Sequence, residues 1–135
     1  AKHYTKRYPI NKLTELCLMI NAKYPEINLI LVGGKDEIEI GEELVDKLTI
    51  KSERFFDLIS NFIGKMSLLE TYNIIEHSKL IITNDTGLMH LASATKTPII
   101  ALFGSTTQNL GFTPLSNNFK IIEVDLECRP CTHIG

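Results

Sequence analysis

The sequence lacks an excess of charge of either sign. Its 14 Lys and Arg residues nearly balance 16 Asp and Glu residues, for a formal net charge of −2. The basic residues are scattered, and the one amino-terminal group, residues 2–7, is too short to form the positive surface that nucleic acids require. We therefore expect no nucleic-acid partner.

Long hydrophobic runs, internal repeats and low-complexity segments are also missing. No apolar run approaches the ~20 residues that span a bilayer, and none has the form of a signal-peptide core. With 135 residues, of which 44% are hydrophobic and 22% charged, the chain can bury one core of its own. These features predict a globular cytoplasmic domain.

Cysteine is too rare for a disulfide framework, because the chain has three. Cys17 lies on an apolar helical stripe and is expected to be a core residue. Cys128 and Cys131 have the spacing of a zinc half-site or a redox pair, but only His133 adds a local ligand. A tetrahedral zinc site needs four ligands, so we predict no metal. The apolar helical stripe that contains Cys17 consists of Leu13, Leu16, Cys17 and Ile20.

The most informative stretch runs from Lys79 to Ala94, where a buried strand leads into a helix. Residues 80–83 suit a parallel strand covered on both faces, and Leu88, Leu91, Ala92 and Thr95 follow the spacing of an amphipathic helix. The change falls on Asp85-Thr86-Gly87. Asp is a preferred N-cap, and Gly lets a ligand approach backbone N–H groups without helical partners. Together with the helix dipole, these groups predict a phosphate site.

His90 lies one turn after Gly87 on the same helical face. Helical side chains lean toward the N-terminus, so its imidazole can reach the same ligand. A plainer interpretation stays open, in which Asp85 is merely a cap and His90 an ordinary surface or core histidine.

A second apolar run, Thr97–Phe103, ends in the hydroxyl-rich loop Gly104–Thr107. Strand, polar loop, helix, strand and polar loop predict a βαβ unit, which brings both loops to the carboxyl edge of a parallel sheet. Ligands of open α/β sheets bind at that edge.

The same patterns divide the rest of the chain into helices and strands. Residues 55–62 have helical spacing, but a strand that contains Phe62 and Ile63 is an alternative. The predicted helices cover residues 9–23, 37–48, 67–77 and 87–96, and the predicted strands cover 28–32, 79–83, 99–103 and 120–124.

These residues resemble the carboxyl-terminal domain of glycosyltransferase family 9, the ADP-heptose:lipopolysaccharide heptosyltransferases. The likeness rests first on Asn84–Ala92 and Thr97–Thr106. Shorter pieces follow in the same order: the Lys-x-aromatic-Pro element Lys6–Pro9, the Gly-Gly turn with its acidic pair at residues 33–37, and Gly64–Leu68. The resemblance implies an α/β fold with a Rossmann-like parallel sheet and helices on both faces, as one lobe of a GT-B type two-lobed glycosyltransferase.

The resemblance also implies a function. Residues 1–135 would be the carboxyl-terminal donor-binding lobe of an enzyme that transfers heptose from ADP-heptose to the lipopolysaccharide inner core. They would be a fragment, lacking the first strand of this lobe and the whole amino-terminal lobe, which would hold the catalytic base and meet the acceptor. We expect no cofactor, and we expect the protein in the cytoplasm, with peripheral association at the inner face of the cytoplasmic membrane as an open option.

Site residues follow from the matching positions. Lys6 and backbone N–H groups would stabilise the diphosphate leaving group, whereas Asp85 would cap the helix or accept sugar hydroxyls. For the nucleoside, Glu37 or Asp36 would accept ribose hydroxyls. The Met66 thioether would lie on adenine or simply pack in the core. The residues predicted for the diphosphate and sugar are Lys6, Asp85, Thr86, Gly87, Leu88 and His90.

Two alternatives remain at this point. A nucleotide-sugar 2-epimerase lobe shares the two-lobed design and the acidic-Ser/Thr-Gly helix start, although Leu88-Met89-His90 fits the heptosyltransferases better. A non-catalytic nucleotide- or phosphate-binding module is the alternative from another class. Ser105 also departs from the family, which usually has Pro after Phe-Gly.

Overall fold

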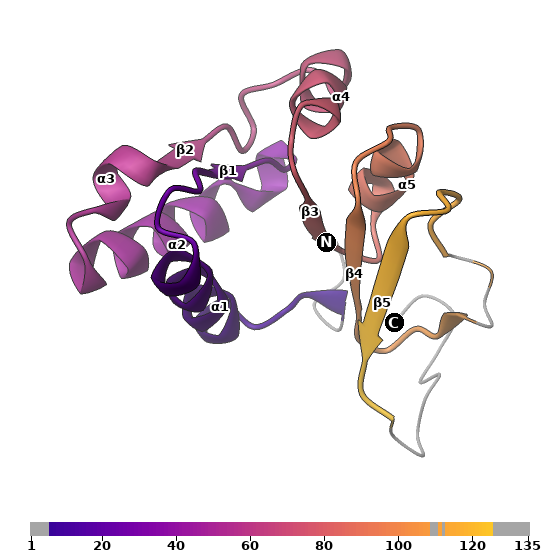
Figure 1. Cartoon of the computed structure of the whole chain (residues 1–135), viewed down its shortest axis with the longest axis horizontal. Helices are drawn as coiled ribbons and strands as arrows, with labels where there is room; N and C mark the ends of the chain where they lie inside the picture. The colour runs from indigo at the N-terminus through magenta and orange to yellow at the C-terminus, as the bar shows by residue number, and fades with distance from the viewer. Residues whose placement is uncertain (1–5, 109–110, 112, 126–135) are drawn as a thin grey trace. The chain divides into compact units, whose positions relative to one another are not determined.

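The computed structural model describes residues 6–108, 111 and 113–125. The chain forms two compact units, Ala1–Tyr8 with Ser67–Gly135, called unit 1, and Pro9–Met66, called unit 2. Each unit combines helices with its own parallel sheet (Figure 1). The predicted α/β fold with parallel strands is therefore confirmed.

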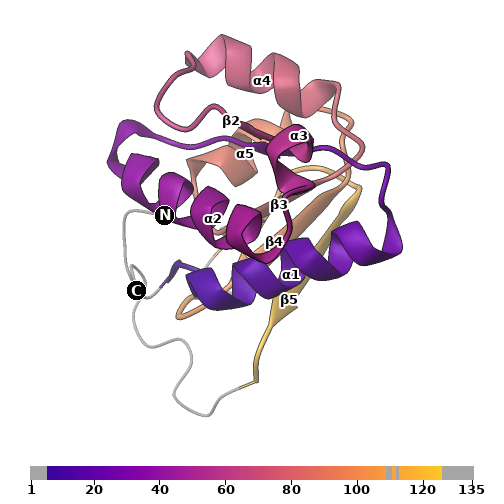
Figure 2. The ribbon, with the colours of Figure 1, turned by 90° about the vertical axis from the view of Figure 1, so that its left-hand side faces the viewer.

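Unit 2 contains the first pair of helices and the first pair of strands. Helices α1 (Ile10–Lys23) and α2 (Ile38–Lys51) lie side by side, as Figures 1 and 2 both show. Strands β1 (Leu29–Leu31) and β2 (Ile59–Asn61) pair in parallel, with Leu29 opposite Ile59. Helix α1 ends at Lys23, and its C-cap Tyr24 stands immediately before a proline that disfavours helical backbone at the preceding residue.

The core of unit 2 consists of buried residues from three helices. Cys17 is 6% exposed, and burial raises the pKa of its thiol to about 11. The expected structural role of this cysteine is confirmed, because it packs with the other members of the core cluster. These are Leu44, Leu48 and Phe55.

The segment 55–63, for which the sequence left helix and strand open, contains both a helix and a strand. Helix α3 (Phe55–Leu58) is a single turn that buries Phe55, and β2 follows it directly. The alternative strand through Phe62 and Ile63 is wrong by a few residues, because the pairing with β1 centres on Ser60. A short 3-10 helix, η2 (Lys35–Glu37), precedes α2.

The loops after β1 and β2 meet at the carboxyl edge of their sheet. Gly64 donates its backbone N–H to the carbonyl of Gly33, with an N–O distance of 3.0 Å. Gly64 has a φ of +73°, and a Cβ there would lie 2.6 Å from the Ile38 side chain. Both observations explain why glycine occupies this position.

Unit 1 holds a three-stranded sheet. Strands β3 (Ile81–Asn84), β4 (Ile99–Phe103) and β5 (Phe119–Glu123) are parallel and lie in that order (Figure 1). Helices α4 (Leu68–Glu76) and α5 (Gly87–Ser93) contribute side chains to the same core as the sheet. The carboxyl ends of β3 and β4 lie together, since Asn84 is opposite Leu102.

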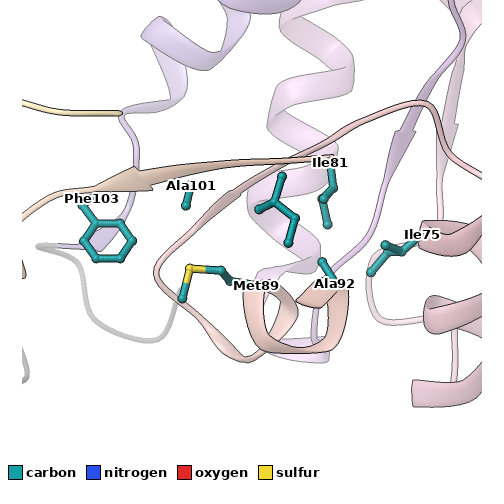
Figure 3. Packing of buried hydrophobic residues seen from close by; sticks show 7 residues of the cluster. Ile75, Ile81, Met89, Ala92, Ala101 and Phe103 are labelled. Carbon is teal, nitrogen blue, oxygen red and sulfur yellow. The ribbon is translucent and has the colours of Figure 1, made fainter. Parts of the chain in front are cut away.

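Figure 3 shows how α5 packs on this sheet. Met89 and Ala92 are fully buried, and they face Ile81 and Ala101 of the strands. The predicted stripe had Leu88 in place of Met89, which is wrong, because Leu88 is only half-buried. The predicted 3.6-residue period is confirmed. The buried face differs from the predicted one by one residue, because it depends on the orientation in which the helix packs on the sheet.

Helix α5 is also shorter than expected, since it ends at Ser93 rather than at Lys96. The Thr95 hydroxyl donates to the carbonyl of Ala92 at 2.7 Å, and the Thr97 N–H donates to that hydroxyl oxygen at 3.2 Å. Such bonds between Thr side chains and the backbone compete with helical ones, so the chain turns toward β4.

Across the described ranges, none of the helices is long and apolar enough to cross a membrane.

Candidate functional site

Asp85 follows the last residue of β3 and is the centre of the site in unit 1. Its carboxylate is buried, with a side chain 5% exposed, and its Oδ2 lies 2.8 Å from Nζ of Lys6. A buried carboxylate is stable only when it is paired or hydrogen-bonded, so this ion pair is a structural requirement of the site. The structure thus brings together two residues that the resemblance had assigned to the same donor site, without predicting that they pair.

A second contact to Asp85 comes from the loop after β4. The hydroxyl of Thr106, which is fully buried, donates to Asp85 Oδ2 at 2.9 Å. The two loops meet because β3 and β4 are parallel neighbours, as the βαβ pattern predicted. Sequence reasoning singled out this hydroxyl-rich loop but assigned no role to Thr106.

Asn84 fixes the segment that carries Lys6. The backbone N–H of Tyr8 donates to Asn84 Oδ1 at 3.2 Å. The neighbours Asn84 and Asp85 therefore hold the segment from Lys6 to Tyr8 at the carboxyl end of β3. Asn84 had no predicted role of its own, although it lies in the motif that carried the prediction.

The start of α5 differs from the expectation. Thr86, in extended backbone, is the N-cap and makes no side-chain capping bond, so the interpretation of Asp85 as the cap is wrong. Asp85 binds Lys6 and Thr106 instead. Because α5 has 7 residues, its dipole is also weaker than that of the predicted ten-residue helix.

Gly87 leaves open space at the first turn of α5. It is exposed, and among the described residues a Cβ built on it would have no heavy atom within 4 Å other than those of its chain neighbours and of its own helix backbone. Leu88 is half-buried, and His90 is exposed. The open alternative of a core histidine is therefore wrong, whereas a surface role and a ligand role both fit.

The predicted nucleoside residues belong to unit 2. Glu37 Oε2 accepts the backbone N–H of Gly34 at 2.9 Å, and it would lie 2.7 Å from a Cβ on Gly33. The Gly-Gly turn therefore lets this carboxylate fold back against the end of β1. Asp36 is exposed and Met66 half-buried, and their ligand roles stay predictions.

In the part of the chain that the structure describes, no group of three or more His, Cys, Asp or Glu residues could hold a metal ion. Cys128, Cys131 and His133 lie outside the described residues.

The edge formed by the ends of β3 and β4 joins a paired buried carboxylate to an open, glycine-containing helix start. The fold is thus of the Rossmann-like α/β class, and because parallel α/β domains bind their ligands at such edges, this edge is the candidate ligand site.

The family model for glycosyltransferase family 9 (heptosyltransferase) matches residues 1–135. The chain belongs to glycosyltransferase family 9. Family membership favours the heptosyltransferase interpretation of the helix start over the nucleotide-sugar 2-epimerase one.

Curated relatives agree with this assignment. Lipooligosaccharide heptosyltransferase 2 of Haemophilus influenzae is 32% identical over 120 residues, which are 88% of this chain and 33% of that protein. Lipopolysaccharide heptosyltransferase 2 of Escherichia coli K12 is 31% identical over 121 residues, again 88% of this chain and 32% of that protein. The chain thus spans about a third of the length of these relatives.

Two solved structures share the fold. The structure titled E. coli ADP-heptose lps heptosyltransferase II has a TM-score of 0.80 and 26% identity, covering 94% of this chain and 39% of that one. The family 9 glycosyltransferase from Veillonella parvula DSM 2008 has a TM-score of 0.74 at 19% identity, over 99% of this chain and 36% of the other, which supports the fold alone.

Proposed function

We propose that this chain is the donor-binding lobe of a heptosyltransferase, which transfers heptose from ADP-heptose to the inner core of lipopolysaccharide. The observation that carries the proposal is the site at Asp85, with Lys6 and Thr106 on its carboxylate and the open helix start beside it. Membership of family 9 and the names of the relatives support the same donor and acceptor.

Asp85 is suited to bind hydroxyl groups of the donor sugar. Both of its hydrogen bonds fall on Oδ2, and within the described residues none falls on Oδ1. A carboxylate oxygen is a strong acceptor for a sugar hydroxyl, and it cannot bind a phosphate oxygen, because like charges repel. Asp85 therefore faces the sugar in this proposal, not the diphosphate.

The diphosphate lies at Thr86, Gly87 and Leu88, where backbone N–H groups meet the open space at Gly87. Helix α5 is short, so local N–H groups contribute more than the dipole of the whole helix. The Lys6 ammonium adds positive charge at the same edge, although its pairing with Asp85 offsets part of it. His90, exposed one turn later, faces the phosphate or the sugar.

In the reaction, the acceptor hydroxyl oxygen forms a bond to the anomeric carbon of heptose. The bond from that carbon to the diphosphate oxygen breaks, and ADP leaves with the electron pair. The hydroxyl proton passes to a carboxylate that we assign to the amino-terminal lobe of the complete protein. The donor lobe contributes groups that stabilise the negative charge growing on the diphosphate.

The nucleoside part of the donor is assigned to unit 2. Glu37 or Asp36 accepts the ribose hydroxyls, and the Met66 thioether lies on adenine. Glu37 has a folded-back position at the end of β1, held by the N–H of Gly34, which makes it the stronger candidate of the two acids. The acceptor, a lipopolysaccharide core, would bring the complete protein to the inner face of the cytoplasmic membrane.

Transfer by the complete two-lobed protein tests the proposal. Purified protein is mixed with ADP-heptose and a heptose-deficient lipopolysaccharide core, and ADP release and the mass of the product are followed. Heptose should be added to the core, and ADP-glucose should be a poor donor. Binding of ADP-heptose without transfer would favour the non-catalytic module, and no binding at all would overturn the assignment of the site.

A further inference from the structure

Thr106 contacts no part of the donor in the proposed function, yet it is fully buried and its hydroxyl reaches Asp85, the central residue of the site. Its hydroxyl lies 2.9 Å from Asp85 Oδ2, and the Lys6 ammonium lies 2.8 Å from the same oxygen. The two donors come from segments far apart in sequence, one before α1 and one after β4. Together they hold a single oxygen of a carboxylate that is almost completely buried.

We propose that Thr106 is a positioning residue, which orients the Asp85 carboxylate so that Oδ1 faces the donor sugar. The inference rests on the proposed function. A carboxylate rotates about its terminal torsion with a broad preference, so one donor fixes its plane poorly. A second donor on the same oxygen removes this freedom, and the position of Oδ1 is then set before the ligand arrives.

The location of Thr106 makes this role specific. Phe103, the last residue of β4, is buried in the core of unit 1, which anchors the loop that carries Thr106. The hydroxyl therefore reaches from the loop after β4 to the residue after β3, along the edge proposed to bind the ligand. Ser would supply the same donor, whereas Val has the shape of Thr without a hydroxyl.

Thr97 provides a matched control in the same unit. It is 3% exposed, and its hydroxyl donates to the carbonyl of Ile75 at 2.6 Å. Thr97→Val thus removes a buried hydroxyl bond of similar geometry that does not involve Asp85. Both Val variants should lower the thermal midpoint, because each removes one of the two hydrogen bonds that its acceptor receives: Lys6 still donates to Asp85 Oδ2, and the Ser78 N–H still donates to the Ile75 carbonyl.

The experiment measures KM for ADP-heptose, kcat, and Kd for ADP alone in the complete protein. We expect Thr106→Val to raise KM or lower kcat so that kcat/KM falls about tenfold, because the carboxylate is misoriented. The Kd for ADP should stay within about twofold, since ADP has no heptose. Thr106→Ser should restore kcat/KM, and Thr97→Val should leave it unchanged.

The outcomes separate this inference from the function on which it rests. Two results would overturn the positioning role while leaving the transferase assignment intact. In the first, Thr106→Val lowers kcat/KM no more than Thr97→Val does. In the second, Thr106→Val raises the Kd for ADP by the same factor by which it lowers kcat/KM. A wild-type protein that neither binds nor uses ADP-heptose would overturn both. If Thr106→Val does not fold, Thr106→Ala against Thr106→Ser gives the same comparison.

Discussion

At the scale of single residues, the pair formed by Lys6 and Asp85 is a buried ion pair, for which we also propose a role in donor binding. Its side chains are 14% and 5% exposed, so neither charge is well solvated. The pair between Lys12 and Glu15 has the same charges at 3.1 Å, but its side chains are 62% and 60% exposed. These two pairs should respond very differently to the loss of the lysine.

Lys6→Met should destabilise the protein by about 3 kcal/mol, because it leaves the buried carboxylate of Asp85 without its counter-charge. Lys12→Met should change stability by less than about 1 kcal/mol. Urea denaturation of the two variants measures the difference. The double variant Lys6→Met/Asp85→Asn should recover part of the loss, and equal effects of the two single variants would contradict a buried pair.

Gly87→Val should weaken donor binding while leaving the fold largely intact. Within the described part of the chain, a Cβ at this position meets no heavy atom within 4 Å beyond its chain neighbours and its own helix backbone, so the fold should tolerate it. A β-branched side chain would, however, occupy the space assigned to the diphosphate. Calorimetry with ADP-heptose compares the variant with wild type. Equal affinities would remove Gly87 from the site.

His90→Ala should reduce the rate of transfer more than it reduces stability, because the side chain is exposed and packs in no core. Turnover per folded molecule and the denaturation midpoint are measured on the same preparation. A loss of several kcal/mol with unchanged turnover would assign His90 a structural role instead.

At the scale of elements, helix α4 begins with a complete capping box. The Ser67 hydroxyl accepts the Glu70 N–H at 3.3 Å, and Glu70 Oε2 accepts the Ser67 hydroxyl at 2.7 Å and its N–H at 2.8 Å. The hydrogen bonds from the Ser67 side chain and backbone lower the pKa of Glu70 below 4.5. The cap is therefore strongest when the carboxylate is charged.

Ser67→Ala should cost about 1 kcal/mol at neutral pH, the usual effect of losing an N-cap. Since the pKa of Glu70 is lowered in the folded state, the part of this stabilisation that comes from the carboxylate is present above pH 4.5 and is lost as the pH falls through the lowered pKa. Denaturation of wild type and variant at several pH values measures this. Ser60→Ala, at an exposed position of β2, is the control. A difference that stays constant into acid would contradict the carboxylate's part in the cap.

At the scale of the whole molecule, both units expose large apolar side chains. Where such side chains adjoin, they usually mark surfaces that other parts of a protein or a partner cover. Since the chain spans about a third of its relatives, we propose that the remainder of the complete protein covers some of them. Those at least 69% exposed are Met19, Ile50, Phe56, Leu68, Leu69 and Leu115.

The 135-residue chain alone should have no transferase activity and should self-associate. The proposed catalytic carboxylate and acceptor pocket lie on the other lobe, and uncovered apolar surface favours association. ADP-heptose and core acceptor test the activity, and size-exclusion chromatography with light scattering tests association. Turnover at the rate of the complete enzyme would contradict the division between lobes, and a stable monomer would contradict the exposed-surface argument.

The sequence by itself determined the class of fold and the position of the candidate site along the chain. Local periodicity is enough to place helices and strands, because the backbone geometry of each repeats every 3.6 or two residues. The strand Ile99–Phe103 was predicted at its observed bounds, and the Asp85-Thr86-Gly87 turn was placed between a strand and a helix. The predicted order of strands and loops also brought the two loops of unit 1 to one edge.

Only the tertiary structure decided how the site residues pair. Lys6 and Thr106 bind Asp85 from 79 and 21 residues away, and no local pattern encodes such contacts. The burial of Met89 in place of Leu88 has the same cause, since a helix's period is local but the face it buries depends on how it docks. Asp85 looked like a cap because Asp often is one, and its partners from elsewhere in the fold changed that role.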